Sequence, residues 1–427
     1  MAISYITGGV AAIVCLFVAF RHFHKKRLVD DLPTSRALGA FIGLVELKGT
    51  AESEAPLTSR LASIPCVAYT WRVEEHWSRT VTETYRDAQG RTQTRTRHES
   101  GWRMMANGGE AAPFYLKDET GVIRIQPDGA KIEDIEAFDR TVTPADPLYY
   151  GKGPAHETAN SDHRRRFRET AIPLHAPLYV MGQARERQDA VAAEVAKDKG
   201  APLFLISIRT EKQVSRGYGV WVWAFAGLGL VAADGGVFIG GLISGTRAGG
   251  GVYAVASGAF VLAAALGWTW TVYNSLVGLR QSVRQAWAQV DIQLKRRHDL
   301  IPALTQVAAA TRTHERDVET IIAALRGQSV APGAALRGVT PTLRALVESY
   351  PDLRSSESFL RLQQSLADTE QRIALARDYY NNIASFYNAR LEIVPDRFVG
   401  ALAGFRQQPL AGAEALERAP VTVRLVS

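Results

Sequence analysis

The sequence is poor in cysteine, which limits the metal chemistry open to it. Its 427 residues include only Cys15 and Cys66, and no Cys-x-x-Cys pair exists. Structural zinc sites built on thiolates need several such ligands at close spacing, so the sequence excludes one. Cys15 falls in an apolar run and Cys66 in a strand-like run. We therefore expect both to be small buried side chains and not partners in a disulfide.

Groupings of catalytic residues are absent as well. The histidines before residue 215 show no metal-ligand spacing, and no Ser or Cys stands in a recognisable nucleophile elbow. The glycine pairs at 108–109 and 151–153 lack the strand–turn–helix setting of a phosphate loop. We therefore expect no enzymatic activity, no cofactor and no metal site. The histidines concerned are His76, His98, His156, His163 and His175.

The excess of basic over acidic residues is also small. The net charge is +7 over 427 residues, whereas a dedicated nucleic-acid-binding protein concentrates basic charge and interleaves it with aromatic residues. Two short basic segments, a hairpin around residues 87–90 and HRRRFRE at 163–169, are open either to phosphate contact or to a solvated surface role. We expect no nucleic-acid partner, and a protein held near an anionic membrane surface.

Long apolar runs, in contrast, are present. Residues 3–20, 217–245 and 252–273 each approach or exceed the length that crosses a bilayer as a helix. The basic run RHFHKKR at 21–27 follows the first of them at once. Because a signal peptide places its charges before its apolar core, we interpret residues 1–27 as an uncleaved anchor whose C-terminal end faces the cytoplasm.

The second and third apolar runs predict a hairpin that leaves both hydrophilic regions in the cytoplasm. Only Arg247 lies between the two runs, while several basic residues flank the pair on the outside, which the positive-inside rule assigns to the cytoplasm. We therefore predict a multi-pass protein of the bacterial inner membrane, with the lipid bilayer as a partner. The flanking basic residues are Arg209, Lys212, Arg216, Arg280 and Arg284.

Asp234 is the single ionisable residue inside these runs. An intramembrane carboxylate is a candidate functional residue, so one reading is a transport or signalling component in which Asp234 handles protons or ions. The other reading is that Asp-Gly-Gly breaks the helix and the run is only partly inserted. The pairs Gly236/Gly240 and Gly241/Gly245 have small-xxx-small spacing, which permits close contact between helices.

Residues 28–215 consist of short strand-like runs separated by Gly, Pro and Asp, which predicts a β-rich domain. The residues around 87–90 predict a hairpin, and residues 163–169 a charged loop that enters a strand. We expect strands at residues 41–48, 65–77, 112–117, 122–126, 166–180 and 202–210.

Several of these runs are similar to a known domain. VELKGTAES (45–53), PCVAYTWRVEE (65–75) and PFYLKDETGVIRIQPDGAKI (113–132) resemble the GIDE-type domain. That domain occurs between two membrane spans in organellar ubiquitin ligases and in bacterial membrane proteins. The ligases act through a cysteine-rich, zinc-binding RING that this sequence lacks. The resemblance therefore implies a fold for residues 28–215 and no ligase activity.

From Tyr273 onward, apolar residues recur at three- and four-residue steps, which predicts long helices with coiled-coil-like stripes. The first helix continues from the third apolar run, residues 327–341 read as a loop, and a shorter helix ends at Pro351. The two main stripes are Leu276, Leu279, Val283, Trp287, Val290 and Leu294, and then Phe359, Leu362, Leu366, Thr369, Ile373, Ala376, Tyr380, Ile383 and Tyr387.

The segment DIQLKRRHDLIP at 291–302 is a dense charged cluster within the first of these helices. Its four-residue spacings predict exposed ion pairs worth about a few tenths of a kcal/mol each. His298 and Asp299 are neighbours and so point in different directions on a helix, which argues against a catalytic relay. We interpret the cluster as an inter-helix or inter-subunit interface, with Glu370 or Asp368 as possible partners. The candidate interface residues are Trp287, Asp291, Lys295, Arg296, Arg297 and Asp299.

The C-terminal part also resembles a known family. YNSLVGLRQSVRQAWAQVDIQLKRRHDLIPAL at 273–304 and LQQSLADTEQRIALARDYYNNIASFYN at 362–388 are similar in order and spacing to the LemA family, over about residues 253–427. The resemblance implies a membrane anchor followed by an antiparallel helical bundle, and it implies no enzymatic activity.

These observations predict an α+β membrane protein with three transmembrane helices. We expect an anchor with its basic flank at 1–27, a β-rich GIDE-like domain at 28–215, two spans within 216–273 and a LemA-like bundle at 274–427. The function we expect is a non-enzymatic, membrane-anchored scaffold that self-assembles as a homo-oligomer. The alternative is a transport or signalling component that uses Asp234.

Overall fold

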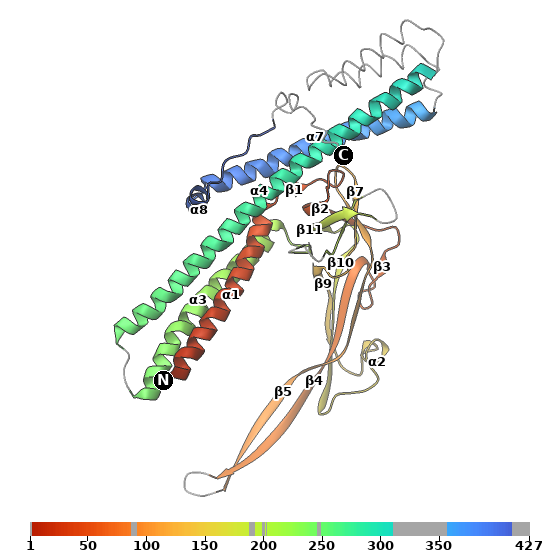
Figure 1. Ribbon diagram of the computed structural model, residues 1–427. Coiled ribbons are helices and arrows are strands. Elements are labelled where there is room, and N and C mark those ends of the chain that lie inside the picture. Colours follow the sequence, from red (N-terminus) through yellow and green to blue (C-terminus); the bar gives the residue numbers. More distant parts are fainter. Residues whose placement is uncertain are drawn as a thin grey trace, which may run out of the picture. The chain divides into compact units, whose positions relative to one another are not determined.

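The computed structural model describes residues 2–86, 92–187, 193–198, 201, 203–245, 249–310 and 357–411. The chain divides into two compact units (Figure 1). One comprises Arg36–Glu211, and the other joins Met1–Ser35 to Lys212–Ser427. The predicted loop at 327–341 and the predicted helix before Pro351 lie outside the described residues. The expectation of both helices and strands in one chain, with three long apolar helices, agrees with this structure.

The unit Arg36–Glu211 is rich in β-strands, as the sequence predicts. Its elements are β2 (Gly43–Glu52), β3 (Leu57–Thr58), β4 (Pro65–Arg86), β5 (Thr92–Ala111), β6 (Phe114–Lys117), β7 (Val122–Ile125), β8 (Lys131–Glu133), β9 (Ile135–Val142), α2 (Leu148–Gly151), β10 (Ser161–Pro173), β11 (Pro177–Glu186), β12 (Ala193–Ala196) and β13 (Leu205–Ser207).

The strands β2, β6, β7, β12 and β11 pair in that order, and β11 pairs with β2 again, so this sheet closes into a small barrel. Alternate residues point inward, because successive side chains of a strand face opposite sides. Two glycines allow close packing: a Cβ on Gly49 would lie 2.3 Å from the Lys117 carbonyl oxygen, and one on Gly182 would lie 2.7 Å from Phe204. The inward residues include Val45, Leu47, Phe114, Leu116, Ile123, Ile125, Leu178, Val180, Ala184 and Val195.

The second sheet has the order β3-β4-β10-β9, with β5 paired to β4. The β4–β10 register ends at Trp77↔Ser161, whereas the β4–β5 register continues to Arg86↔Thr92. The two strands therefore extend beyond the sheet as a long two-stranded ribbon (Figure 1). The predicted hairpin is confirmed in its two arms, and residues 87–91 between them lie outside the described part.

The sequence prediction for residues 166–180 was wrong in one respect. These residues form the end of β10 and the start of β11, which belong to different sheets, and not a single strand. The chain turns at Leu174–Ala176, where His175 adopts a positive φ of 62°. Pro173 and Pro177 bracket the turn, and this pair was the available sequence signal. The run HRRRFRE at 163–169 lies within β10 and is not a loop.

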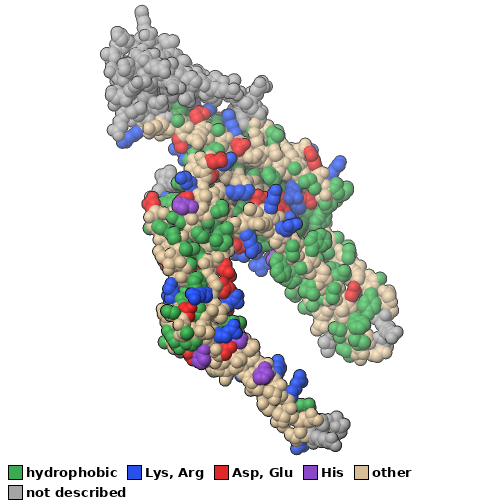
Figure 2. All heavy atoms as spheres, turned by 180° about the vertical axis from the view of Figure 1, so that it is seen from behind, with side chains coloured by type: hydrophobic (Ala, Val, Ile, Leu, Met, Phe, Trp, Pro, Cys, Tyr) green, Lys and Arg blue, Asp and Glu red, His purple; other side chains and the backbone are tan. Residues whose placement is uncertain are grey.

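The other unit is built from helices α1 (Ala2–Asp31), α3 (Glu211–Ser244), α4 (Gly250–Ala310), α7 (Glu357–Glu392) and α8 (Asp396–Leu402). Three of them contain segments long and apolar enough to cross a membrane, namely Ser4–Asp31, Glu211–Ile243 and Gly250–Leu300. Their outer faces expose large apolar side chains such as Trp223 (80 % exposed) and Phe17 (68 %). Figure 2 shows hydrophobic side chains spread over these long helices.

The first and second apolar helices cross at a pair of glycines. A Cβ on Gly8 would lie 2.5 Å from the Cα of Gly236, and one on Gly240 would lie 3.1 Å from the ring of Tyr5. The small-residue spacing of Gly236 and Gly240 is therefore used, and its partner is the first apolar helix. Close backbone approach of this kind supports helix association in membranes.

Helix α4 runs without interruption from the third apolar run into the helical bundle, as predicted, and it continues through Pro302 to Ala310. Helix α7 packs against it in the opposite direction, since Trp287 contacts Tyr380 and Arg297 pairs with Glu370. The described members of the two predicted stripes lie between these helices: Leu276, Leu279, Val283 and Val290 are buried on α4, and Leu366, Ile373, Tyr380 and Tyr387 on α7.

Candidate functional sites

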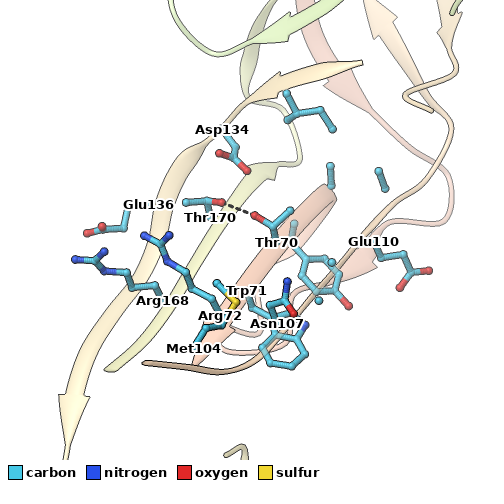
Figure 3. Close-up of a pocket in the computed structure, with 16 residues that line it drawn as sticks. Thr70, Trp71, Arg72, Met104, Asn107, Glu110, Asp134, Glu136, Arg168 and Thr170 are labelled. Carbon is cyan, nitrogen blue, oxygen red and sulfur yellow. Dashed lines mark hydrogen bonds between the residues drawn. The ribbon is translucent and has the colours of Figure 1, made fainter. Parts of the chain in front are cut away.

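A groove of about 630 Å³ lies on the face of the second sheet of the β-rich unit (Figure 3). Strands β4, β5, β10 and β9 supply most of its wall, and β8 supplies Ile132. The lining residues are Ala68, Tyr69, Thr70, Trp71, Arg72, Met104, Asn107, Gly108, Gly109, Glu110, Ala111, Ile132, Asp134, Glu136, Arg168 and Thr170.

Glycines line part of the groove, where a side chain would not fit. A Cβ on Gly109 would lie 2.7 Å from the carbonyl oxygen of Tyr69, and one on Gly108 would lie 2.9 Å from the Trp71 ring. The pair that lacked a phosphate-loop setting in the sequence thus keeps β5 close to β4. On the neighbouring strands β4 and β10, the hydroxyls of Thr70 and Thr170 share a hydrogen bond of 2.9 Å.

The charged residues of the groove are of both signs. Arg72 and Arg168 stand directly opposite each other on β4 and β10, and Arg168 donates to Asp139 at 3.0 Å. Asp134 and Glu136 approach the same space from β9 and the residue before it (Figure 3). The lining residues include no histidine or cysteine. This arrangement can bind a ligand that carries both hydrogen-bond donors and acceptors.

Arg165, within the run at 163–169, forms a buried ion pair. Arg165 donates to Glu75 at 3.1 Å, and both side chains are 0 % exposed. The same guanidinium donates to the backbone carbonyls of Tyr149, Pro154 and His156 at 3.0, 2.7 and 2.8 Å. Burial also raises the pKa of the Tyr149 hydroxyl to about 12. Arg165 therefore fastens residues 149–156 to the sheet.

Three further charged members of that run also make ion pairs or hydrogen bonds, whereas Arg164 is exposed. Arg166 and Arg168 both pair with Asp139, at 2.6 and 3.0 Å. Glu169 is buried and accepts hydrogen bonds from the backbone N–H groups of Leu61 and Ala62. This pattern assigns the run a structural role in the sheet.

The histidines of this unit pair separately and do not form one site. His76 lies 2.5 Å from Asp162, His175 lies 2.8 Å from Glu52, and the hydroxyl of Thr80 lies 3.0 Å from His98. Within the described residues, no group of three or more His, Cys, Asp or Glu side chains is placed to hold a metal ion.

Asp234 lies in an unbroken helix, because α3 extends from Glu211 to Ser244. The reading in which Asp-Gly-Gly breaks the helix was therefore wrong. Ser257 of α4 donates to the two carboxylate oxygens of Asp234 at 3.0 and 2.9 Å. This contact links α3 to α4 and gives the partly buried carboxylate a hydrogen-bond donor.

Next to this contact, an apolar groove of about 490 Å³ lies among helices α1, α3 and α4. Small side chains dominate its walls. Its lining residues are Tyr5, Gly9, Ala12, Ile13, Leu16, Ala233, Val237, Val252, Val255, Ala256, Ala259, Phe260 and Ala263.

The charged cluster near residues 291–299 divides between two environments. Trp287 stacks edge-on against Tyr380 with ring centroids 5.1 Å apart, and Arg297 pairs with Glu370 at 3.4 Å. Both thus contact α7 of the same chain, with Glu370 as one of the expected partners. The other expected partner, Asp368, pairs with Arg372 instead. The remaining candidates are exposed: Asp291, Lys295, Arg296 and Asp299.

The ion pairs predicted inside the cluster are not formed. Residues 291–299 are described in full, and neither Asp291–Lys295 nor Lys295–Asp299 lies within ion-pair distance in that stretch. Exposed pairs of long side chains gain little in water, and holding them costs side-chain entropy. Whether the exposed residues contact another subunit stays a prediction.

A buried polar network that the sequence reading missed lies where α1, α4, α7 and α8 meet. Arg27 donates to Asp396 at 2.6 Å and to Ser275 at 3.0 Å, and Ser275 donates to Asp31 at 2.6 Å. Arg390 pairs with Asp31 at 2.5 Å. Arg27, Asp31 and Asp396 have side chains only 5–6 % exposed. The one sequence signal was the four-residue spacing of Arg27 and Asp31.

Comparisons with known proteins match both halves of this architecture. A family model described as "LemA family" matches residues 286–425, and the GIDE model, described as "E3 Ubiquitin ligase", matches residues 82–238. Both expected resemblances are therefore confirmed. The GIDE match begins at residue 82, after the expected start at 28, and extends into α3, beyond the expected end at 215. The LemA match begins at residue 286, after the expected start at 253.

Curated relatives are similar over a short stretch only. The magnetosome proteins MamQ 1 and MamQ 2 of Paramagnetospirillum magneticum are each 35 % identical over 65 residues, which is 15 % of this chain and 24 % of theirs. MamQ of Magnetospirillum gryphiswaldense is 34 % identical over the same length. The chain thus matches about a quarter of the length of these relatives.

Proposed function

We propose that this protein is a non-enzymatic, membrane-anchored scaffold that self-assembles at the bacterial inner membrane. The proposal starts from a chain in which a region that matches the GIDE model precedes a region that matches the LemA family. The network centred on Arg27 is the observation that carries the proposal. It fastens the cytoplasmic end of the predicted anchor to the helical bundle through buried charges. Breaking such a network leaves charges buried without partners, so the anchor and the bundle act as one piece.

Two further observations support a binding role over a catalytic one. Conspicuous buried charges, such as Arg165 with Glu75 and Arg27 with Asp396, are engaged in contacts that hold elements together. The ligase described by the GIDE model acts through a zinc-binding RING, and two cysteines do not supply one. The groove lined by Arg72, Arg168 and Glu136 gives the scaffold a surface on which to hold a ligand.

The membrane role has independent support. Three helices have the length and apolar character of membrane spans. Both the β-rich unit and the bundle face the cytoplasm in this proposal.

Cysteine labelling tests the topology. In a background with Cys15→Ala and Cys66→Ala, single cysteines replace Ser100, Ser385 and Gly249, which are all exposed. A membrane-impermeant thiol reagent added to intact spheroplasts, with the periplasmic face accessible, labels only the cysteine at 249. Labelling at 100 or 385 under those conditions contradicts the proposal.

The particle mass tests self-assembly. The protein, extracted in native lipids without detergent exchange, is expected to form particles that contain two or more copies of its 46.7 kDa chain. A uniform single-chain particle across the concentrations used would reject self-assembly.

A second candidate function is a transport or signalling component that uses Asp234. The observation in its favour is the hydrogen bond from Ser257 to this carboxylate inside an apolar helical hairpin. The variant Asp234→Asn keeps an oxygen that accepts this bond and removes the charge. In this reading the variant folds normally but changes proton or ion flux in proteoliposomes. Unchanged flux removes this candidate.

A further inference from the structure

Two asparagines of α7 each bind the main chain of one residue in an extended segment that follows α8. The side-chain amide of Asn388 donates to the carbonyl oxygen of Gln408 and accepts from its N–H, both at 2.8 Å. Asn381 makes the same pair of bonds with Ala411, at 3.2 and 2.8 Å. Each amide thus pairs with a residue in the way a neighbouring β-strand would.

The spacing of the two asparagines matches the spacing of an extended chain. They are seven residues apart on the helix, which is about 10.5 Å along its axis. Gln408 and Ala411 are three residues apart, which is about 10 Å in an extended strand. Between them, the hydroxyl of Tyr380 donates to the carbonyl oxygen of Pro409 at 2.8 Å. Asn381, Asn388 and Tyr380 therefore form a ladder, which we call the α7 ladder.

The α7 ladder contacts main-chain atoms of the segment in each of these bonds. The side chains of Pro409 and Leu410 are exposed. The requirement on a bound segment is therefore an extended chain whose N–H groups are free at two positions three residues apart, so that neither position is proline. Recognition of an extended peptide through its backbone is sequence-tolerant for the same reason.

Residues 406–411 follow directly on residues that are fixed to the bundle. Gly404, with a φ of 68°, ends α8, and Phe405 packs under Arg280, whose guanidinium lies 5.0 Å from the ring. Beyond Phe405 the segment buries little apolar surface and is held by hydrogen bonds. Water can replace such bonds when the segment leaves, so each contributes modestly to its retention.

We propose that in the assembled protein the α7 ladder of one copy binds residues 406–411 of a neighbouring copy. This inference rests on the proposed self-assembly and names the contact that carries it. Because the ladder binds main chain, the bonds made between copies equal those made within one chain. Six residues reach at most about 20 Å, and two helices that pack side by side lie about 8–10 Å apart, so the segment reaches. Exchange in one direction around a set of copies links them in series.

A crosslinking experiment tests the exchange in the full-length protein. In the background without Cys15 and Cys66, one tagged copy carries Asn388→Cys, and a second copy with a different tag carries Gln408→Cys. The two are co-expressed and treated in their membranes with a short bifunctional thiol reagent. The matched control replaces Asn388→Cys with Asn382→Cys, because Asn382 lies off the ladder and donates to Asp378.

The expected result is a covalent dimer that carries both tags, at least fivefold more abundant for position 388 than for position 382. A single chain carrying both Asn388→Cys and Gln408→Cys provides the within-chain reference. Efficient crosslinking there, with none between copies, overturns the exchange. The mass of the same sample in native lipids separates the two proposals. Oligomers without crosslinks between copies refute the exchange alone, and single-chain particles refute the scaffold as well.

Discussion

Arg27 and Asp396 stand 369 residues apart in the chain, yet Nη2 of the arginine donates to Oδ2 of the aspartate at 2.6 Å. The pair joins the end of the first apolar helix to the short helix that follows the bundle. Neither side chain has more than 6 % of its surface exposed. Arg27 belongs to the basic run that was expected near the lipid surface, yet its side chain is buried and holds two helices together.

Removing this arginine should destabilise the helical unit strongly. We expect Arg27→Ala to lower the free energy of unfolding by about 3 kcal/mol, because it leaves the Asp396 and Asp31 carboxylates buried without their cation. Denaturant unfolding in lipid nanodiscs measures the change. The matched control is Lys26→Ala, whose pair with Asp30 is partly exposed and whose loss should cost less than about 1 kcal/mol. Equal losses in the two variants would contradict the fastening role.

Arg165 is expected to hold residues 149–156 against the sheet of the β-rich unit. Replacing it by methionine removes the donor to three backbone carbonyls. Hydrogen exchange followed by mass spectrometry should then show roughly tenfold faster exchange in residues 148–158, which corresponds to about 1.4 kcal/mol of lost protection. Arg164→Met is the control, because Arg164 is exposed in the same strand. Unchanged exchange in Arg165→Met would show that the loop is held by other contacts.

The crossing of α1 and α3 predicts a sharp difference between adjacent glycines. A Cβ on Gly8 meets the backbone of Gly236 at 2.5 Å, while one on Gly9 meets nothing within 4 Å. We expect Gly8→Ala to destabilise the helical unit by about 1–3 kcal/mol through overpacking. Gly9→Ala should be neutral or slightly stabilising, because alanine favours helix. Unfolding in nanodiscs compares them, and similar behaviour of both variants would rule out a tight crossing.

Cys66 gives the β-rich unit a pH dependence at alkaline pH. Burial, with smaller effects from the Glu169 and Glu110 carboxylates, raises the pKa of the thiol from 9.0 to about 11. The folded protein therefore keeps this proton where the unfolded chain has lost it. The stabilisation is complete below pH 9 and declines as the pH rises toward 11.

The measurement is the free energy of unfolding across that range, compared with Cys66→Ala. The wild-type protein should lose more stability than the variant between about pH 8 and about pH 10.5. Parallel profiles would mean that the thiol does not titrate with a raised pKa. Slow alkylation of the native thiol at pH 8, with rapid alkylation after unfolding, provides a second check.

The elements that the sequence predicted well are those with a clear local pattern. A short apolar run punctuated by glycine marked β2, and the three- and four-residue steps from Leu276 to Val290 marked the face of α4 that packs on α7. Such patterns are local, so they survive without knowledge of the partner. The turn between Pro173 and Pro177, which separates β10 from β11, was not predicted, although the two prolines were a signal for it.

The sites were harder to foresee, because burial of a charged residue is decided by distant parts of the chain. Arg164, Arg165 and Arg166 are chemically alike in sequence, yet only Arg165 faces Glu75 in the interior. Arg27 likewise depends on Asp396, which no local spacing connects to it. The groove of the β-rich unit is formed by residues of several strands. Its glycines allow β5 to lie close to β4, and this role cannot be read from the sequence because the pairing of the two strands is not known there.

Helix α4 is continuous over its 61 residues, so a tilt of its apolar part also moves the part that packs in the bundle. From Ser275 to Ala310 it extends for about 50 Å. Membrane helices tilt by up to about 40° as bilayer thickness changes. Where the apolar part of α4 lies in a bilayer, a change of about 10° in tilt sweeps its far end through roughly 9 Å. A change in lipid composition would thereby move the outer end of the bundle, and no ligand would be needed.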